Sequence, residues 1–345
     1  MIRVSRRQLT VAYVGFGVSV REYHIPYVED REDVKAKYVF RRQEDIAQFA
    51  DYEPFYPEIT FTTDFDAVLN DPEVNLVVVS APDAFHVPYA KRILSAGKHA
   101  LIEKPFAPTA AEAREVFALA KEKGLVCMPN QNRRFDADFL AVKDVLASGK
   151  LGKLVRLESH YDYFKTNGWY DHLGTLYNLG VHTTDQIISL LGMPDRVRFD
   201  VRSIHHPGAG DDYYDLEFFY GNSKATVSTS MCVLIDYPRF TLHGTNGSFT
   251  LPPVIHNSGK KKTVGRHVIN RSPASEDRWG TLVYMKDGEK VTEKVPVGCA
   301  RYERIYDSLI GAIERGEEKC VKDEEVVRVL EILEEATEVA KSWNR

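Results

Sequence analysis

The sequence of 345 residues has only four cysteines, and they lie far apart, at Cys127, Cys232, Cys299 and Cys320. No two of them form a Cys-x-x-Cys pair, and none stands near histidines at the spacing of a zinc site. These absences argue against a disulfide framework and against a bound metal. Isolated thiols are typical of proteins in a reducing compartment, so we expect a cytoplasmic protein.

Long apolar runs and an excess of positive charge are also missing. Apolar runs such as Leu76–Ala81 are far shorter than the roughly 18 residues of a membrane span. The basic start, Met1–Gln8, lacks the apolar stretch of a secretory signal. The net charge is −5, whereas nucleic-acid binders carry a basic balance or a basic stripe. We therefore expect neither a membrane partner nor a nucleic-acid partner.

The composition is that of a globular protein, with 43% hydrophobic and 28% charged residues. At roughly 100–200 residues per domain, the length predicts two domains. In residues 1–129, short apolar runs alternate with helical segments, a pattern typical of parallel strands covered on both faces. We therefore predict an α/β N-terminal Rossmann domain over residues 1–129. Its expected strands are Leu9–Val14, Ala36–Phe40, Leu76–Ser80, His99–Ile102 and Leu125–Met128, and its expected helices are Pro88–Ala96 and Thr109–Lys123.

The pattern changes near residue 130, where strands separated by turn signals predominate. For residues 130–345 we predict an α+β C-terminal domain with a large, mostly antiparallel open sheet that serves substrate binding and oligomerisation. Because its strands are rich in apolar and aromatic residues, we expect an exposed apolar face and a homodimer or higher homo-oligomer. The expected strands are Leu154–Tyr163, Val197–Ile204, Tyr213–Tyr220, Ala225–Val233, Phe240–Gly244, Trp279–Met285 and Val291–Val295.

A glycine-rich turn, Gly15-Phe16-Gly17, directly follows the first expected strand. Glycines there permit a tight turn and let backbone N–H groups approach a pyrophosphate at a helix N-terminus. Val20 stands where the full motif has a third small residue, so the motif is incomplete. The prediction therefore rests on the position of the turn between an expected strand and an expected helix. We expect a dinucleotide to bind here, and the alternative is a plain tight turn.

Two arginines, Arg41 and Arg42, follow the second expected strand, where NAD-dependent enzymes usually carry an acid. A guanidinium suits the 2′-phosphate of NADP. We therefore predict NADP as the cofactor. NAD is the alternative if Glu44 supplies the acid, and two solvated arginines at a strand end are the structural alternative.

Two further segments carry candidate chemical groups. Lys104, in Glu103-Lys104-Pro105, follows the fourth expected strand, and ligands bind at the carboxyl ends of parallel strands. Asn178, His182 and Asp185 have spacings that place them on one face of a helix, and histidine exchanges protons near neutral pH. The alternatives are a solvated lysine and a buried, hydrogen-bonded histidine.

The Gly-Phe-Gly turn, the Glu-Lys-Pro segment and a Gly-x-His-x-x-Asp helix occur together in this order. With these motifs the chain resembles the Gfo/Idh/MocA (glucose–fructose oxidoreductase / inositol dehydrogenase) family over nearly its whole length. It looks most similar to bacterial oxidoreductases of that family. Further matching segments are Ala81-Pro82, His86, Gln131–Phe135, Gly149–Gly152 and Tyr302.

The resemblance implies a two-domain NAD(P)-dependent dehydrogenase that acts on a sugar, a cyclitol or a related polyol or keto compound. It places Lys104 and His182 at the catalytic centre, where His182 accepts the hydroxyl proton and Lys104 stabilises charge on the same oxygen. The residues expected to bind the cofactor are Gly15, Phe16, Gly17, Arg41, Arg42, Ala81, Pro82, His86, Glu103 and Lys104. Those expected to contact or orient the substrate are Arg134, Tyr161, Tyr163, Asn178 and Asp185.

Two positions depart from the family pattern. Asn178 stands where the family usually has an aspartate, and Val20 replaces a small residue. An amide cannot raise the basicity of a histidine as a carboxylate does. These departures leave open a catalytically weak NADP-binding sensor or regulator. A glycosidase with a tightly held NAD and a structural dimer module are less favoured alternatives.

Overall fold

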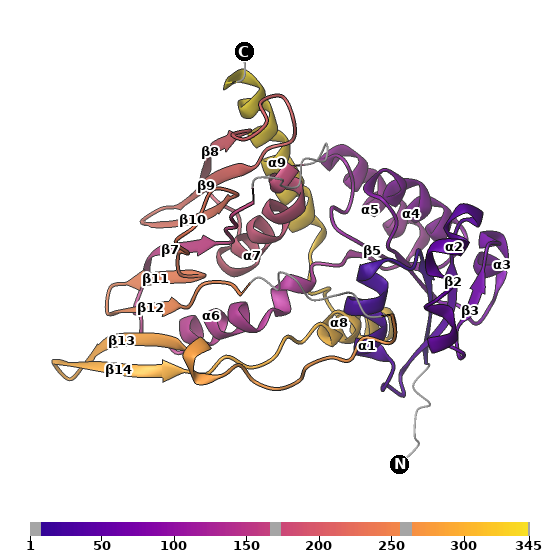
Figure 1. Ribbon diagram of the computed structural model, residues 1–345, viewed down its shortest axis with the longest axis horizontal. Coiled ribbons are helices and arrows are strands. Elements are labelled where there is room, and N and C mark those ends of the chain that lie inside the picture. Colours follow the sequence, from indigo (N-terminus) through magenta and orange to yellow (C-terminus); the bar gives the residue numbers. More distant parts are fainter. Residues whose placement is uncertain (1–7, 166–173, 256–263, 344–345) are drawn as a thin grey trace. The chain divides into compact units, whose positions relative to one another are not determined.

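The computed structural model describes residues 8–165, 174–255 and 264–343 (Figure 1). These residues group into two compact units. The first unit takes in residues 8–132, 264–270 and 302–327, and the second takes in 133–165, 174–255, 271–301 and 328–343. The domain boundary expected after residue 129 stays a prediction, because the two units alternate along the later part of the chain.

The first unit contains a six-stranded parallel sheet in the order β3-β2-β1-β4-β5-β6, which confirms the predicted Rossmann architecture. Every residue of β1 and β4 is buried, because helices cover a doubly wound sheet on both faces. Strand β3 was not predicted, since its three residues are half-buried or exposed and form no apolar run. The strands are β1 (Leu9–Val14), β2 (Val34–Phe40), β3 (Thr60–Thr62), β4 (Leu76–Val79), β5 (His99–Ile102) and β6 (Cys127–Pro129).

Helices connect these strands. The hydroxyl of Thr109 accepts a hydrogen bond from the backbone N–H of Glu112 and so caps helix α5, which then ends at the left-handed Gly124. The peptide bond between Lys104 and Pro105 is cis. The helices are α1 (Ile25–Val28), α2 (Ile46–Phe49), α3 (Phe65–Asn70), α4 (His86–Ser95), α5 (Ala110–Lys123) and α8 (Glu303–Arg315), and a π-helical turn, η1 (Ser19–His24), precedes α1.

The second unit contains an eight-stranded sheet in the order β14-β13-β12-β11-β7-β10-β9-β8. Only β7 and β10 pair in parallel among these strands of the described chain, so the sheet is mostly antiparallel as predicted. The strands are β7 (Leu154–His160), β8 (Arg196–Arg202), β9 (Tyr213–Tyr220), β10 (Ser223–Ser230), β11 (Phe240–Gly244), β12 (Gly247–Leu251), β13 (Gly280–Lys286) and β14 (Glu289–Val295). The helices are α6 (Ala137–Ala147), α7 (Val181–Leu191), which follows the π-helical turn η6 (Leu176–Gly180), and α9 (Asp323–Trp343), most of which lies in this unit.

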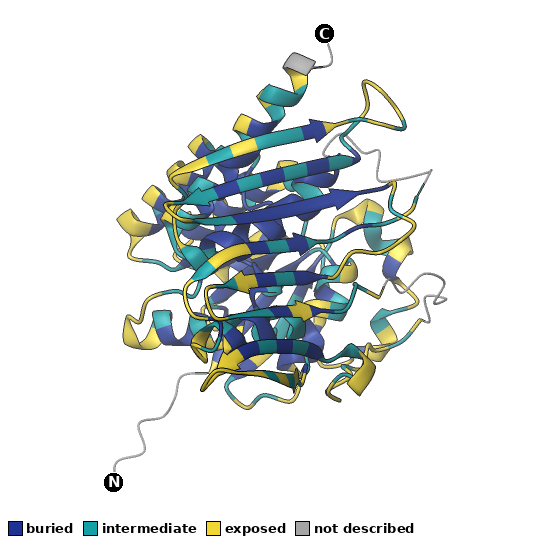
Figure 2. Cartoon of the chain, turned by 90° about the vertical axis from the view of Figure 1, so that its left-hand side faces the viewer, coloured by how far each residue is buried: buried dark blue, intermediate teal, exposed yellow. Residues whose placement is uncertain are grey.

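The two faces of this sheet differ in polarity. Alternate residues such as Leu216 and Val227 are buried in one core with side chains of α6, α7 and α9. The other face has no helix over it (Figure 2). It carries polar side chains, including the ion pairs Arg202–Asp200, Lys224–Glu217 and Arg156–Glu158. The expectation of an apolar open face is therefore wrong, because strand alternation directs the apolar residues into the core.

Candidate cofactor site

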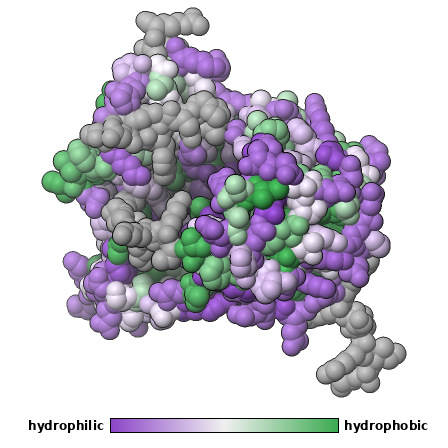
Figure 3. All heavy atoms as spheres, turned by 45° about the vertical axis from the view of Figure 1, so that its right-hand side comes forward, coloured by the Kyte–Doolittle hydropathy of each residue, from purple (hydrophilic) through white to green (hydrophobic). Residues whose placement is uncertain are grey.

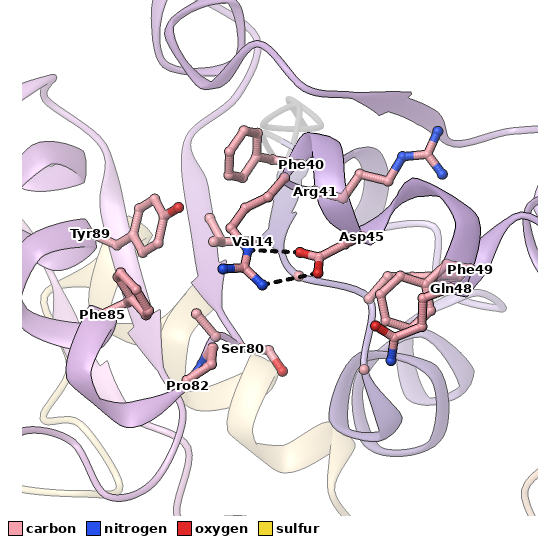
Figure 4. Close-up of a pocket in the computed structure, with 15 residues that line it drawn as sticks. Val14, Phe40, Arg41, Asp45, Gln48, Phe49, Ser80, Pro82, Phe85 and Tyr89 are labelled. Carbon is pink, nitrogen blue, oxygen red and sulfur yellow. Dashed lines mark hydrogen bonds and ion pairs between the residues drawn. The ribbon is translucent and has the colours of Figure 1, made fainter.

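A pocket in the first unit opens at the carboxyl ends of β1, β2 and β4, where open α/β sheets bind their ligands. Strands β1 and β4 are adjacent in the sheet, and β2 lies on the other side of β1. The pocket is lined by Val14, Gly15, Phe16, Gly17, Phe40, Arg41, Arg42, Asp45, Gln48, Phe49, Ser80, Ala81, Pro82, Phe85 and Tyr89 (Figure 4).

The glycine turn has the shape that a pyrophosphate requires. Gly15 has a φ of 91°, and a Cβ on it would lie 2.4 Å from the backbone oxygen of Ser80, so only glycine fits between β1 and β4. A Cβ on Gly17 would meet no atom within 4 Å, so the turn leaves open space beside the backbone of this residue. The residues present therefore fit the pyrophosphate of a dinucleotide.

The two predicted arginines have different surroundings. The Arg41 guanidinium pairs with Glu53 and lies 5.4 Å from the ring centre of Phe61, and Figure 4 shows it extending away from Ser80 and Pro82. Arg42 donates two hydrogen bonds to Asp45, at 2.9 and 3.0 Å, which are the dashed lines of Figure 4. Because its side chain is 46% exposed, Arg42 is the arginine whose charge faces solvent at this pocket.

Three predicted cofactor residues, His86, Glu103 and Lys104, do not line this pocket. The ring nitrogens of His86 lie 2.7 Å from the carbonyl oxygen of Pro105 and 2.9 Å from that of Ala81. This buried ring therefore connects the segments that follow β4 and β5. It positions Ala81, which does line the pocket.

Glu103 directly follows β5 and is the acceptor of a largely buried hydrogen-bond network. Its Oε1 accepts hydrogen bonds from Asn130 Nδ2 at 2.8 Å, from the Ser19 hydroxyl and from His24 Nε2 at 2.9 Å. Its Oε2 accepts the backbone N–H of Lys104 at 3.2 Å. The carboxylate thus joins η1, which follows the glycine turn, to the backbone of the predicted catalytic lysine.

The network continues from His24 into helix α8. His24 Nδ1 lies 2.9 Å from the hydroxyl of Tyr306, which lies 3.5 Å from that of Tyr13. Burial raises the pKa of Glu103, but hydrogen bonds from His24, Ser19 and Asn130 and the charge of His24 outweigh it and lower the pKa to about 2. Glu103 is therefore a carboxylate at neutral pH.

In the second unit, the predicted residues Arg134 and Asp185 bind each other. Arg134 Nε and Nη2 donate to the two carboxylate oxygens at 2.7 and 2.6 Å, and the side chains are 4% and 1% exposed. This bidentate pair joins the segment before α6 to α7. Asp185 follows His182 by three residues in α7, so the ion pair holds this part of the helix in place.

Two of the remaining predicted residues, His182 and Asn178, lie at and just before the start of α7. His182 is buried in its first turn, and the Asn178 amide donates to the carbonyl of Gly174 at 2.8 Å. Asn178 lies in the π-helical turn η6, so the uniform α-helical spacing expected from the sequence does not hold there. Tyr163 packs beside Tyr161, with 5.9 Å between ring centres, and burial raises the pKa of Tyr163.

Several pocket residues were not predicted. Gln48, Phe49, Phe85 and Tyr89 come from segments that follow β2 and β4, and no motif marks them in the sequence. Asp45 could have been predicted from the sequence, because it lies four residues after Arg41, where it can supply the acid expected after β2. The prediction weighed Glu44 for that role instead.

Neither a metal site nor a membrane-spanning helix is found among the described residues. In residues 8–165, 174–255 and 264–343, no three histidine, cysteine or acidic side chains come together as a metal site. No helix in the same part of the chain has the length and apolar character needed to cross a bilayer. The face in Figure 3 carries mostly hydrophilic residues, with apolar ones in small groups.

Comparison with protein-family models matches both parts of the chain. A model described as an oxidoreductase family with an NAD-binding Rossmann fold matches residues 9–131. A model of the C-terminal alpha/beta domain of the same family matches residues 143–343. The chain belongs to the Gfo/Idh/MocA oxidoreductase family. Its first unit therefore contains an NAD(P)-binding Rossmann domain, and the pocket at β1, β2 and β4 is the natural place for the dinucleotide.

Several known oxidoreductases match nearly the full length of the chain. The oxidoreductase YhhX of Escherichia coli is 45% identical and covers 96% of this chain and 97% of its own length. The crystal structure of yhhX has a TM-score of 0.84 at 43% identity and covers 96% of both chains. The scyllo-inositol 2-dehydrogenase (NADP(+)) IolW of Bacillus subtilis is 28% identical over 96% of this chain and 94% of its own.

Proposed function

We propose that this oxidoreductase is an NADP(H)-preferring dehydrogenase or reductase that acts on a CH–OH group of a sugar, a cyclitol or a related polyol or keto compound. The observation that carries the proposal is the glycine turn that packs against Ser80 and opens into a pocket at the strand ends. The relative named as an NADP-dependent scyllo-inositol dehydrogenase supports the substrate class.

Different residues of the pocket would bind different parts of the dinucleotide. Backbone N–H groups at Phe16 and Gly17 would hold the pyrophosphate, since that of Gly15 donates to the carbonyl of Phe40, and Arg42 would bind the 2′-phosphate. When bound, the nicotinamide ring supplies the hydride acceptor for alcohol oxidation and the donor for ketone reduction.

The protein supplies the acid–base groups. Lys104 follows β5, and its backbone is fixed through Glu103, so its ammonium would hydrogen-bond the substrate oxygen and stabilise developing negative charge. His182 would take the hydroxyl proton in oxidation and return it in reduction. Arg134 and Asp185 hold each other and would orient α7, which carries His182.

Asn178 bears on the efficiency of the reaction. Its amide is uncharged and is hydrogen-bonded to Gly174, so it does not supply the negative charge that an aspartate supplies four residues before the histidine. The Asn178→Asp variant should raise the pKa of His182 and move the rising limb of the oxidation rate to higher pH. A rate profile that keeps its position would exclude a charge role for this residue.

The substrate class is tested by an assay of NADPH oxidation and NADP reduction across inositols, aldoses, polyols and their keto forms. Wild type should turn over at least one member of the panel. Lys104→Met should bind NADPH but should not turn over the compound that wild type turns over. Binding of NADPH by both proteins with no turnover on any compound would support the sensor or regulator instead.

Cofactor preference is tested at the two arginines. Because Arg42 is the exposed arginine at the pocket, Arg42→Ala should weaken NADPH binding roughly 10- to 100-fold and change NADH binding little. The matched control, Arg41→Ala, should have the smaller effect, since that guanidinium pairs with Glu53. Fluorescence titration of both reduced cofactors measures this, and tighter NADH binding by wild type would contradict the preference.

We also propose that two copies associate through the open face of the eight-stranded sheet. Charges of both signs, such as those of Arg202–Asp200 and Lys224–Glu217, lie on that face, and a two-fold axis would set charges of one sign against charges of the other sign on the second copy. Light scattering should give twice the 39.2 kDa mass of the chain. Glu217→Lys should shift the equilibrium toward the monomer, because it replaces the ion pair with Lys224 of the same chain by two like charges on the proposed contact face. A 39.2 kDa particle for wild type at micromolar concentration would contradict the proposal.

A further inference from the structure

Arg239 lies inside the second unit, directly before β11, and no motif marks it in the sequence. Its side chain is only 2% exposed. Its backbone is fixed in the sheet, because its N–H donates to the carbonyl of Leu251 at 3.1 Å and its carbonyl accepts the N–H of His160 at 3.0 Å. The guanidinium therefore extends from a rigid part of the fold.

The guanidinium of Arg239 connects three elements of this unit. Its Nε donates to Oδ2 of Asp138, in the first turn of α6, at 3.0 Å. Its Nη1 donates to the hydroxyl of Ser159 in β7 at 2.6 Å, and its Nη2 donates to Oε1 of Gln186 in α7 at 3.1 Å. Helices α6 and α7 both pack on the sheet face opposite the open one (Figure 1). A planar guanidinium presents its donors in fixed directions, so one side chain holds both helices against β7.

The bond to Gln186 bears on the proposed base. Gln186 is 1% exposed and follows His182 by four residues in the regular helix α7, so the two side chains lie on the same face of that helix. The Gln186 amide nitrogen also donates to the carbonyl of Arg133 at 2.8 Å. Both ends of the amide are therefore bound, and a rotation of this helix face would break one of the two bonds.

Arg239 also contacts Tyr161, which the family resemblance names as a substrate contact. The Cζ of Arg239 lies 5.1 Å from the ring centre of Tyr161, and the Cζ of Arg133 lies 4.9 Å from the same ring centre. Nη1 of Arg133 donates to the Tyr161 hydroxyl at 3.1 Å. One buried guanidinium thus contacts both this ring and the residue that holds the helix of His182.

Packing alone does not account for Arg239. Removing a charged group from water is costly, and an apolar side chain of similar volume fills a core without that cost. What an apolar side chain cannot supply is a set of directed bonds to Asp138, Ser159 and Gln186. These bonds fix the position of α7 relative to the sheet.

We propose that Arg239 is a positioning residue for catalysis, which holds the helix face of His182 in place through Gln186. This inference rests on the role proposed for His182 as the base. A base must lie within about 3 Å of the group whose proton it takes, and a displacement of about 1 Å can lower a rate by about 10²-fold. The carboxamide of Gln186 is the link through which Arg239 acts.

The test compares Arg239→Lys, Gln186→Leu and the double variant in the full-length protein. Arg239→Lys keeps the charge, but a single ammonium cannot replace the three directed bonds. Gln186→Leu removes the acceptor on α7. Each variant should lower kcat roughly 10- to 100-fold on a compound that wild type turns over, and NADPH affinity should stay within about twofold. The double variant should lose no more than the weaker of the two single variants, because both substitutions break the same connection.

Asp138→Asn is the matched control, because it weakens a different bond of the same guanidinium. Its amide oxygen can still accept the backbone N–H of Phe139, which the carboxylate accepts at 2.7 Å. This variant should unfold at a lower urea concentration than wild type and keep kcat within about threefold. A kcat loss in Asp138→Asn as large as that in Gln186→Leu, or losses that multiply in the double variant, would overturn the proposal.

Hydrogen–deuterium exchange provides a readout that does not depend on turnover. The amides of Val181–Leu191 in α7 should exchange at least tenfold faster in Arg239→Lys and Gln186→Leu than in wild type, and those of Ala110–Lys123 in α5 should keep the wild-type rate. Wild-type exchange of α7 in both variants would overturn the positioning role, whatever the activity. Fast exchange of α7 in a protein whose wild type turns over no compound would contradict the proposed function and support the hold of Arg239 on the helix.

Discussion

Each unit of this protein holds a carboxylate inside its structure, and the two are shifted in opposite directions. In the first unit, the pKa of Glu103 is lowered to about 2, although burial alone would raise it. In the second unit, burial raises the pKa of Asp211 to about 6 and outweighs hydrogen bonds from Thr175 and Leu176. Burial therefore does not by itself decide the charge of a carboxylate in this fold.

The donors explain the difference. Asp211 accepts the Thr175 hydroxyl at 2.5 Å and the Leu176 backbone N–H at 2.8 Å, and both donors are uncharged. Glu103 also has uncharged donors, but its Oε1 lies 2.9 Å from Nε2 of His24, a ring that can carry a positive charge when protonated. The ionisable donor His24 thus accounts for the difference between the two carboxylates. Glu103, which follows β5 and precedes Lys104, is ionised at neutral pH, whereas Asp211 titrates near pH 6.

The largest expected effect comes from removing the charged donor. His24→Leu leaves Glu103 buried without its cation, and breaking a buried pair in this way typically costs about 3–5 kcal/mol. Urea unfolding at pH 7 measures the loss. His24→Gln is the matched control, since it keeps a donor without the charge, and it should lose less. Equal losses of unfolding free energy in the two variants would show that the shape of the His24 side chain, rather than its charge, stabilises the site.

The next effect is the acid response of the first unit. The folded pKa of Glu103, about 2, is below the ordinary value of 4.5 for a glutamate, so its contribution to stability is complete above pH 4.5 and is lost as the pH falls toward 2. Glu103→Gln removes this contribution. Its free energy of unfolding should therefore depend less on pH than that of wild type between pH 4.5 and 2. Parallel curves would contradict the assigned shift.

Asp211 should respond in the opposite direction and by less. Its folded pKa of about 6 is above the ordinary value of 3.8 for an aspartate, so its contribution to stability is complete below pH 3.8 and is lost as the pH rises through 6. Asp211→Asn keeps an oxygen for both donors. At pH 8 it should be more stable than wild type by about 3 kcal/mol, and the gain should vanish near pH 4. A variant that is less stable at pH 8 would refute this.

The same contrast shows what the sequence could predict. Strands β1 and β4 are readable because a parallel sheet buries both faces and leaves unbroken apolar runs. The open sheet was recognised as mostly antiparallel, but its open face was expected to be apolar. The sequence shows which residues alternate, and only the structure shows which of the alternating sets faces the helices.

The site was predictable only where a local motif marks it. The Gly15–Gly17 turn and the Lys104 strand end follow from short segments beside a strand. The network around Glu103 does not, since its partners His24 and Tyr306 come from distant parts of the chain. The π-helical turns η1 and η6 also gave no signal, because their residues fit an ordinary helix.

The central claim is that this member of the Gfo/Idh/MocA family catalyses NAD(P)-dependent chemistry through Lys104 and His182. The most direct measurement compares kcat for wild type, Lys104→Met and His182→Ala on a compound that wild type turns over, with NADPH affinity measured in parallel. Both variants should lose about 10²–10⁴-fold in kcat while NADPH affinity stays within a few-fold of wild type. Near-full turnover by Lys104→Met would contradict the claim, because the lysine would then be only a structural strand end.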